Sequence, residues 1–501
     1  MSFCKGSVVS KHLSGVFLLI FTFMRFRASF ILLLIAASFI TLMSISCKKE
    51  RNTLTVGGDL RFSDDTLSFD TIFTAAGSFT TGILIYNPNN QEVILSSVRM
   101  HNANSFFRLN VDGFSGNNVP NIRIAPRDSI YVFATVTIDP TNNLIPFIVT
   151  DSLVATLNGK EFFLPFTAYG QNARYLRDSL ITTNTVWDTT LPYVIINSAG
   201  IASGATLTIN AGCRIYMHQN SGLVVFGKLI ANGTPQDSII FQGDRLDRRY
   251  FGYEGYPGEW GGIYFHSYSS GSVLRYTRIE NGGNGALGNP TSIWVDIDSN
   301  ATGAQPQLRM ENCIVKNSIG SGIYSRKGTI SATNSLFHTT GGYALAIIQG
   351  GKDTFTNCTF ANYGGTALSH TTQGTVAILN YYKPDQNTIF YGDLQATLRN
   401  CIVYGSLDSE IVCSAVPEAA ASLHLDHCLL RMGTVRESFV TFTNCLFNKD
   451  PLFKDTQKGD FRLRTSSPAI GTANSAYTPP SDLTGSSRSG SNDIGCYRFL
   501  E

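Results

Sequence analysis

The chain has 501 residues, 43% of them hydrophobic, and a formal net charge of +2. Length and composition favour roughly two to four globular domains with ordinary cores, and the small net charge gives no general positive field for binding nucleic acid. Charged residues make up only 15% and glycines number 46, which is typical of buried strands joined by tight turns.

Residues 1–47 differ in character from the rest of the chain. A short basic head precedes an apolar run from Phe30 to Met43, and small residues then lead to Cys47. The run is shorter than the roughly 20 residues that a membrane span needs. This order resembles a bacterial lipoprotein signal peptide, which implies that Cys47 is lipidated and holds the mature protein on a membrane. The implied location is the cell envelope, as an outer-membrane lipoprotein on the periplasmic or cell-surface side.

Two features of this segment leave alternatives open. Ser44 stands three residues before the cysteine, where such signals usually have leucine, so a single uncleaved signal anchor is the alternative. A second apolar patch precedes Met24, and only a start at Met24 gives a normal charged head, so the true start is either Met1 or Met24. Residues 48–58 are expected to form a tether.

Residues 59–170 alternate apolar and polar side chains in short segments, as in Leu67–Phe73. Asn158-Gly159 separates two such segments and predicts a tight hairpin turn. About seven short antiparallel strands predict a β-sandwich. The order of the segments resembles immunoglobulin-like modules of the Hydin and major-sperm-protein type. The domain is interpreted either as a spacer from the membrane or as a protein-binding module.

Residues 171–453 carry an internal repeat. A phrase of Asn, or once His, followed by Cys or Ser and two more residues recurs six times, with steps of 22, 23, 43, 27 and 17 residues. A period in this range predicts a solenoid of short strands. The Cys or Ser of the phrase is, in chain order, Cys313, Ser335, Cys358, Cys401, Cys428 and Cys445.

The beginning of this region gives the repeat a family likeness. Segments at 205–216, 222–234 and 237–241 are separated by Gly-containing turns, and they closely resemble the first coils of right-handed β-helix proteins of the pectin-lyase-like class. The predicted fold class is all-β, with an N-terminal β-sandwich followed by a right-handed single-stranded parallel β-helix.

Stacking of neighbouring coils predicts columns of period-matched side chains. The cysteines of the phrase should form a buried thiol column rather than disulfides, because their side chains point the same way. The preceding asparagines, with His427 among them, should form a ladder at the turns. The spacing of cysteine and histidine fits no zinc site, so we expect no metal and no cofactor.

A loop after residue 242 concentrates carboxylates, arginines and aromatic side chains in a chain otherwise poor in charge. Aromatic faces stack on sugar rings, and Arg and Asp bind hydroxyl or uronate groups, so this loop is the candidate polysaccharide-binding site. The alternatives are a loop that packs over the first coils through internal Asp–Arg pairs, and a protein contact. The candidate residues are Asp244, Arg245, Asp247, Arg248, Tyr250, Tyr253 and Trp260.

Two further loops leave the repeat, at residues 284–304 and 381–392. The first contains Trp294, Asp296 and Asp298, and an Asp-x-Asp pair is a weak calcium signal. No carboxylates share a column of the coils and no Gly-x-Ser-x-Gly motif occurs, so no catalytic residue is assigned.

The C-terminal residues 454–501, together with Asp450-Pro451 just before them, resemble the terminal segment of bacterial surface β-helix proteins. Gly471 and Cys496 stand where that family has Asp and Ala. Because a solenoid needs a cap on its last open edge, residues 474–491 are expected to lie across the last coil.

Together these patterns predict a cell-envelope lipoprotein whose β-helix is a non-catalytic binding or structural scaffold, directed toward glycans. One alternative is a polysaccharide lyase or glycoside hydrolase with its site on the side of residues 243–260. The other is a protein–protein module of an envelope complex. The expected partners are the membrane, through Cys47, and a polysaccharide.

Overall fold

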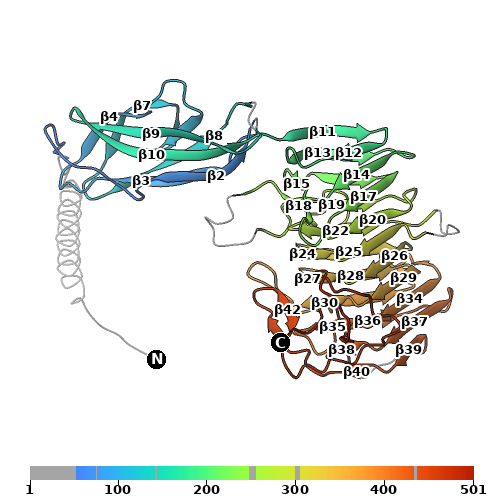
Figure 1. Ribbon diagram of the computed structural model, residues 1–501. Coiled ribbons are helices and arrows are strands. Elements are labelled where there is room, and N and C mark those ends of the chain that lie inside the picture. The colour runs from blue at the N-terminus through green and yellow to red at the C-terminus, as the bar shows by residue number, and fades with distance from the viewer. Residues whose placement is uncertain are drawn as a thin grey trace, which may run out of the picture.

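The computed structural model describes residues 52–74, 76–141, 144–246, 255–299, 305–433 and 437–500 (Figure 1). Every regular element in these ranges is a β-strand. Cys47 and the predicted signal peptide lie outside the described residues, so their prediction stands as made. Within the described ranges, no helix has the length and apolar character needed to cross a membrane.

The N-terminal domain consists of two five-stranded sheets around one hydrophobic core. The first sheet contains, in order, β1 (Arg61–Phe62), β3 (Thr81–Tyr86), β8 (Ser129–Val136), β5 (Phe107–Val111) and β6 (Phe114–Ser115). The second contains β2 (Leu67–Phe73), β10 (Lys160–Gln171), β9 (Phe147–Leu157), β4 (Val93–Met100) and β7 (Asn118–Ile124). The pairings are antiparallel except for β2 with β10, which is parallel.

The core of this sandwich is aromatic, and its best-predicted turn is the β9–β10 hairpin. The Phe107 ring lies 5.6 Å from Phe69 and 5.4 Å from Phe166, in the tilted and edge-on arrangements that aromatic quadrupoles favour. Asn158 and Gly159 join the hairpin with φ values of 48° and 81°, the left-handed pair that a type I′ turn requires. The predicted Asn-Gly hairpin is confirmed.

The second domain is a stack of coils whose parallel strands form three faces (Figure 1). Most coils add one strand to each face, as do β23 (Leu308–Glu311), β24 (Ile314–Ser318) and β25 (Ser321–Arg326). The first face contains β15 (Arg214–Met217), β18 (Ile239–Gly243), β21 (Thr277–Glu280), β24 (Ile314–Ser318), β27 (Leu336–Thr340), β30 (Thr359–Asn362), β35 (Ile402–Gly405), β38 (Leu429–Leu430) and β40 (Leu446–Phe447). The second face contains β16 (Gly222–Val225), β19 (Gly262–Phe265), β22 (Thr291–Val295), β25 (Ser321–Arg326), β28 (Leu345–Ile348), β31 (Val376–Leu379) and β36 (Ile411–Ser414).

The third face is a separate ten-stranded parallel sheet. It contains β12 (Thr185–Trp187), β14 (Thr206–Asn210), β17 (Lys228–Asn232), β20 (Ser272–Arg275), β23 (Leu308–Glu311), β26 (Thr329–Thr333), β29 (Gly351–Thr356), β34 (Leu394–Arg399), β37 (Ala421–Asp426) and β39 (Val440–Thr443). Strands β11 (Arg174–Ile181) and β13 (Tyr193–Ile201) open the stack by spanning the first and second faces. The predicted fold class, a β-sandwich followed by a right-handed parallel β-helix, is confirmed.

The predicted thiol column is also confirmed. Cys313, Cys358, Cys401 and Cys428 are free and fully buried, and Cys445 is free and half-buried. Each lies between a strand of the third face and a strand of the first face, and Sγ of Cys428 lies 3.3 Å from the main-chain oxygen of Leu398 on the preceding coil. The column therefore packs the corner of the coils as small apolar side chains do.

The asparagine column adopts the left-handed backbone expected at these turns, but its amides are used differently from the prediction. All six residues, including His427, have φ between 49° and 56°. Asn400 Nδ2 donates to Asn357 Oδ1 at 3.1 Å, as in a ladder. Asn312 and Asn334 instead donate to main-chain oxygens of the C-terminal segment at 2.6 Å. The segment competes successfully for these donors because it runs directly past them.

The path of residues 474–491 corrects the prediction that this segment crosses the last coil. Asn474 contacts Asn400, and Ser481 contacts Asn334. Beyond that, Gly485 lies against Pro235 of an early coil. The segment therefore runs back along the side of the stack, over the outer side of the first face.

Residues 450–500, which we call the cap, bury the outer side of the first face. A second core forms where Phe453, Phe461 and Leu463 of the cap pack on Leu336 and Ile402. The strands β41 (Phe453–Asp455) and β42 (Asp460–Leu463) form a small antiparallel hairpin there. The first face is thus covered by the cap over part of its length, and a hollow remains where the cover ends.

Candidate functional site

The predicted sugar-binding loop is described only at its two ends. Asp247, Arg248, Tyr250 and Tyr253 lie outside the described residues, so their role stays a prediction. Trp260 is fully buried, and its indole N–H donates to the main-chain oxygen of Glu280 at 2.8 Å. The prediction that Trp260 is a ligand-stacking residue is therefore wrong, because the large apolar ring fills the core of the coil and offers no face to solvent.

Asp244 and Arg245 lie at the junction between the two domains. Asp244 Oδ2 lies 2.6 Å from His218 Nδ1, and this hydrogen bond raises the pKa of His218 above its ordinary value. The guanidinium carbon of Arg245 lies 5.5 Å from the centre of the Phe79 ring in the sandwich, within cation–π range. The two residues thus contact the junction, beside the packing of Phe73 of β2 on Tyr216 of β15 at 4.7 Å.

The described part of the loop at 284–304, residues 284–299, carries a polar network around Asp296. Asp296 accepts a hydrogen bond from the Tyr264 hydroxyl at 2.7 Å and forms an ion pair with Arg326 at 2.7 Å. Arg326 and the hydrogen bonds lower the pKa of Asp296 although burial opposes this shift. Tyr264 also stacks on Trp294 at 4.3 Å. Among the described residues, no three His, Cys, Asp or Glu side chains are grouped to hold a metal ion.

One hollow lies between the first face and the cap, and we call it the coil–cap groove. Its volume is about 580 Å³. Arg278 of β21, Lys316 of β24 and His338 of β27 line it from the coils. Lys458 and Tyr497 line it from the cap. The groove therefore joins residues that are more than 200 positions apart in the chain.

On the coil side of the groove, the lining side chains come from three strands that pair in register, β21, β24 and β27. Glu280 pairs with Lys316, and Lys316 pairs with His338, on three successive strands. Side chains at one register position stack at roughly 4.8 Å intervals along a parallel sheet. These three therefore form one polar column, and Arg278 lies two residues before Glu280 on the same strand.

One carboxylate in this column is held between two cations. Arg278 contacts Glu280 Oε1 at 2.5 Å, and Lys316 Nζ lies 3.9 Å from Glu280 Oε2. The Glu280 side chain is only 7% exposed, against 41% for Arg278 and 17% for Lys316. Arg278 and Lys316 line the groove, whereas the carboxylate of Glu280 lies behind them.

His338 adds an uncharged imidazole to the groove. Its burial, with Lys316 and Arg278 nearby, lowers its pKa to about 3. Its Nδ1 lies 2.9 Å from the Thr339 hydroxyl, and its ring packs on Phe461 of the cap at 4.9 Å. At neutral pH this histidine is a polar but neutral wall of the groove.

Asn281 supplies a buried donor without a partner. The residue is 1% exposed and lines the groove. Its Oδ1 accepts a hydrogen bond from Asn317 Nδ2 at 2.7 Å, while its own Nδ2 has no hydrogen-bond partner. Both asparagines have left-handed backbone, with φ of 64° and 55°, which fixes them at the turn between the first and second faces.

Sequence reasoning missed the groove residues, although a signal for them was present. Lys316 and His338 stand three positions after Cys313 and Ser335 of the repeated phrase, respectively. Glu280 stands three positions after Thr277, which the register of β21 and β24 places level with Cys313. Charged or titratable side chains at one phase of an otherwise apolar repeat predict a polar column. The cap residues that complete the groove have no such periodicity.

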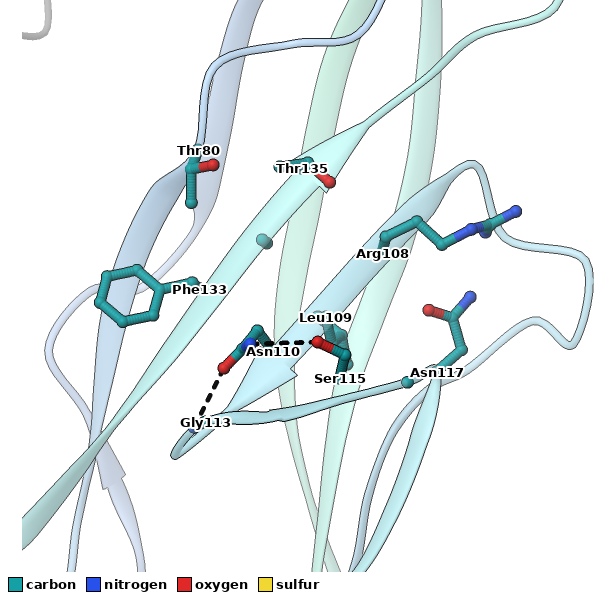
Figure 2. A pocket seen from close by; sticks show the side chains of 11 residues that line it. Thr80, Arg108, Leu109, Asn110, Gly113, Ser115, Asn117, Phe133 and Thr135 are labelled. Carbon is teal, nitrogen blue, oxygen red and sulfur yellow. Dashed lines mark hydrogen bonds between the residues drawn. The ribbon is translucent and has the colours of Figure 1, made fainter.

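A second hollow, of about 720 Å³, lies on the outer side of the sandwich beside β5 and β8 (Figure 2). Figure 2 shows Phe133 on one side of it and Arg108 and Asn117 on the other. The side-chain amide of Asn110 forms hydrogen bonds within the turn. It donates to the Ser115 hydroxyl at 3.1 Å and accepts from the Gly113 N–H at 3.0 Å. These contacts stabilise the β5–β6 hairpin. Because they already use the amide of Asn110, this hollow is a weaker candidate for a binding site than the coil–cap groove.

A match to a protein family supports the architecture of the second domain. Residues 177–353 match the family described as "Right handed beta helix region". No curated protein matches the chain. One similar solved structure is a family 123 glycoside hydrolase from Clostridium perfringens, with 11% identity, a TM-score of 0.17, and coverage of 25% of this chain and 26% of that chain. Another is the catalytic domain of a GH87 alpha-1,3-glucanase in complex with tetrasaccharides, with 9% identity, a TM-score of 0.19, and coverage of 78% and 92%.

The chain thus spans about a quarter of the first of these structures. The likenesses are too distant to carry the activity of either enzyme to this protein.

Proposed function

We propose that this protein is a cell-envelope scaffold that binds a glycan without cleaving it, and that the coil–cap groove is the binding site. The observation that carries the proposal is the lining of the groove. It combines the tyrosines Tyr256 and Tyr497 with Arg278, Lys316 and the amide of Asn281. Aromatic faces pack on sugar rings, and guanidinium, ammonium and amide groups bind sugar oxygens.

The same lining argues against glycoside hydrolysis at this site. Hydrolases of this kind need two carboxyl groups about 5 to 10 Å apart, one on each side of the scissile bond. None of the described residues lining the groove is Asp or Glu. Glu280, the nearby carboxylate, is committed to Arg278 and Lys316.

A glycan array probed with the full-length protein tests the proposal. Binding to at least one glycan, weakened tenfold or more by Tyr256→Ala or Lys316→Ala, is the expected result. Lys352→Ala is the matched control, because Lys352 is exposed on the third face. Binding that is equally strong in all three variants would place the site elsewhere, and an array without any binding would refute the function.

The proposed location rests on the sequence before residue 52. A lipidated Cys47 places the sandwich between the membrane and the β-helix, where it serves as a spacer. Mass spectrometry of the membrane fraction is the direct measurement. A chain with an unmodified Cys47 and an intact segment before it contradicts the lipoprotein anchor.

A further inference from the structure

The outer side of the first sheet of the sandwich carries three exposed aromatic residues. Tyr131 and Phe133 lie on β8 and Tyr86 lies on β3, and the alternation of buried and exposed residues places all three on the outer side. They are 57%, 42% and 39% exposed, respectively. Leu84 pairs with Tyr131, which makes Tyr86 the diagonal neighbour of Tyr131 at roughly 7–8 Å. The three rings therefore form one line across β8 and β3, which we call the aromatic row.

The Phe133 ring leans onto the neighbouring strand. Phe133 pairs with Gly82 of β3, and a Cβ at Gly82 would stand 3.0 Å from two carbons of the Phe133 ring. The missing side chain of Gly82 therefore gives the ring its place, and Figure 2 shows the ring broadside, to the side of its own strand. The Tyr131 ring is parallel to it within 5°, with the ring centres 5.7 Å apart. Two neighbouring rings thus present parallel faces.

Polar hollows lie at both ends of the aromatic row. The hollow of about 720 Å³ beside Phe133 is also lined by Arg108 and Thr135, which pair across β5 and β8. A hollow of about 450 Å³ beside Tyr86 is also lined by Arg61, which pairs with Tyr86 across β1 and β3. Both arginines are exposed. Strand register therefore places an arginine, whose guanidinium has several N–H donors, near each end of the row.

The exposed area of the aromatic row favours a polysaccharide over a protein as its partner. Aromatic side chains present about 200 Å² each, so the exposed fractions of the three rings leave about 300 Å² of aromatic surface in total. A protein interface of standard size covers about 800 Å² on each partner, with an apolar core. A sugar ring needs only one aromatic face, together with donors and acceptors for its hydroxyl groups. A narrow row between two polar hollows matches that second requirement.

We propose that the aromatic row is a second glycan-binding site, which holds a linear polysaccharide. The sugar rings stack on the three aromatic rings, and Arg61 and Arg108 bind sugar hydroxyl groups at the two ends. This site goes beyond the proposed function, which concerns the coil–cap groove of the other domain. The sandwich is then a binding module as well as a spacer.

Affinity electrophoresis of the full-length protein tests the proposal. The gels contain one of four soluble polysaccharides: hydroxyethyl cellulose, xylan, glycol chitin or linear dextran. We expect at least one of them to retard the protein, and Tyr131→Ala to weaken that binding about tenfold through the loss of one stacked ring. Tyr131→Phe keeps the ring and should keep the affinity of the parent.

Two further variants separate the orientation of the rings from their mere presence. Gly82→Ala places a methyl group against the Phe133 ring and should displace it, so binding should weaken although all three aromatic residues remain. Tyr169→Ala is the matched control, because Tyr169 is also 42% exposed but lies on β10 of the other sheet. Its affinity should equal that of the parent. Unfolding temperatures within a few degrees of the parent establish that the variants fold.

The outcomes separate the aromatic row from the coil–cap groove. Retardation by none of the four polysaccharides, or retardation that neither Tyr131→Ala nor Gly82→Ala weakens, overturns the second site. If Lys316→Ala in the groove abolishes binding and Tyr131→Ala leaves it intact, the proposed function stands and the second site does not. Self-association of the parent that Tyr131→Ala abolishes, measured by analytical ultracentrifugation, would make the row a protein contact and also overturn the inference.

Discussion

Asp353 presents an ionisable carboxyl group to the interior of the coils, and its removal gives a sharp test of the energetics. The residue lies on β29, in register with Ile330 of one neighbouring coil and Ala396 of the other. It is 1% exposed. Its Oδ1 accepts from the Ile330 N–H at 3.0 Å, and its Oδ2 has no partner. We predict that Asp353→Asn changes how stability depends on pH.

The sign follows from the pKa. Burial raises the pKa of Asp353 well above its ordinary value of 3.8, because the low dielectric disfavours the charged form. Above pH 3.8 the unfolded chain has lost this proton while the folded chain still holds it. The stability of the folded state therefore falls as pH rises, by about 1.4 kcal/mol per pH unit, until the folded pKa is passed. Asparagine keeps an acceptor for Ile330 and cannot titrate.

Urea unfolding of parent and variant between pH 4.5 and 8 measures the effect. The variant should gain stability relative to the parent at each step upward in pH. Asp237→Asn is the control, because Asp237 is exposed and should leave the pH profile unchanged. His338 titrates in both parent and variant, so its contribution cancels in the difference. If the profiles of parent and Asp353→Asn stay parallel over the whole range, the carboxyl group is not held protonated and the reasoning fails.

Three further predictions concern other parts of the molecule. Trp260→Phe should lower the free energy of unfolding by about 1 kcal/mol through its lost hydrogen bond, and Trp260→Ala should lower it by about 3–5 kcal/mol, both measurable by thermal unfolding. An Ala variant as stable as the parent would contradict the burial of Trp260. Cys401 and Cys428 should resist alkylation in the folded protein and react after unfolding, because burial raises both thiol pKa values; labelling of the folded state, read by mass spectrometry, would disprove this. The pKa of His218, measured by NMR, should fall in Asp244→Asn, and the pair should stabilise the fold below pH 6.5 and lose that effect as pH rises through the raised pKa; because His218 is 45% exposed, the contribution should stay below about 1 kcal/mol.

Trp260 shows one limit of prediction from the sequence. Its aromatic ring, next to a charged loop, suggested sugar stacking. Trp260 instead lies two residues before β19, and its ring packs in the core of the coils. A local cluster of residue types cannot tell which side of a strand a given side chain occupies, because one residue of register reverses it.

The asparagine column shows a different limit. The sequence indicated the left-handed turns correctly, because Asn adopts that conformation more easily than other residues that have a Cβ. It did not indicate the acceptors of the amides. The acceptor for Asn312 is the main-chain oxygen of Asp482, 170 positions away, and nothing local encodes that pairing.

The sequence by itself determined the β-helix and its thiol column. Each coil repeats the environment of the one before it, so the packing requirement of the core appears in the chain as a period of one coil. Only the tertiary structure decided the coil–cap groove. That groove depends on the cap returning along the first face, so that Phe461 packs on His338 and Lys458 lines the same hollow as Lys316. Contacts between a periodic stack and a non-periodic segment leave no period in the sequence, and their position is set by side-chain packing and by the asparagine donors that hold the returning chain.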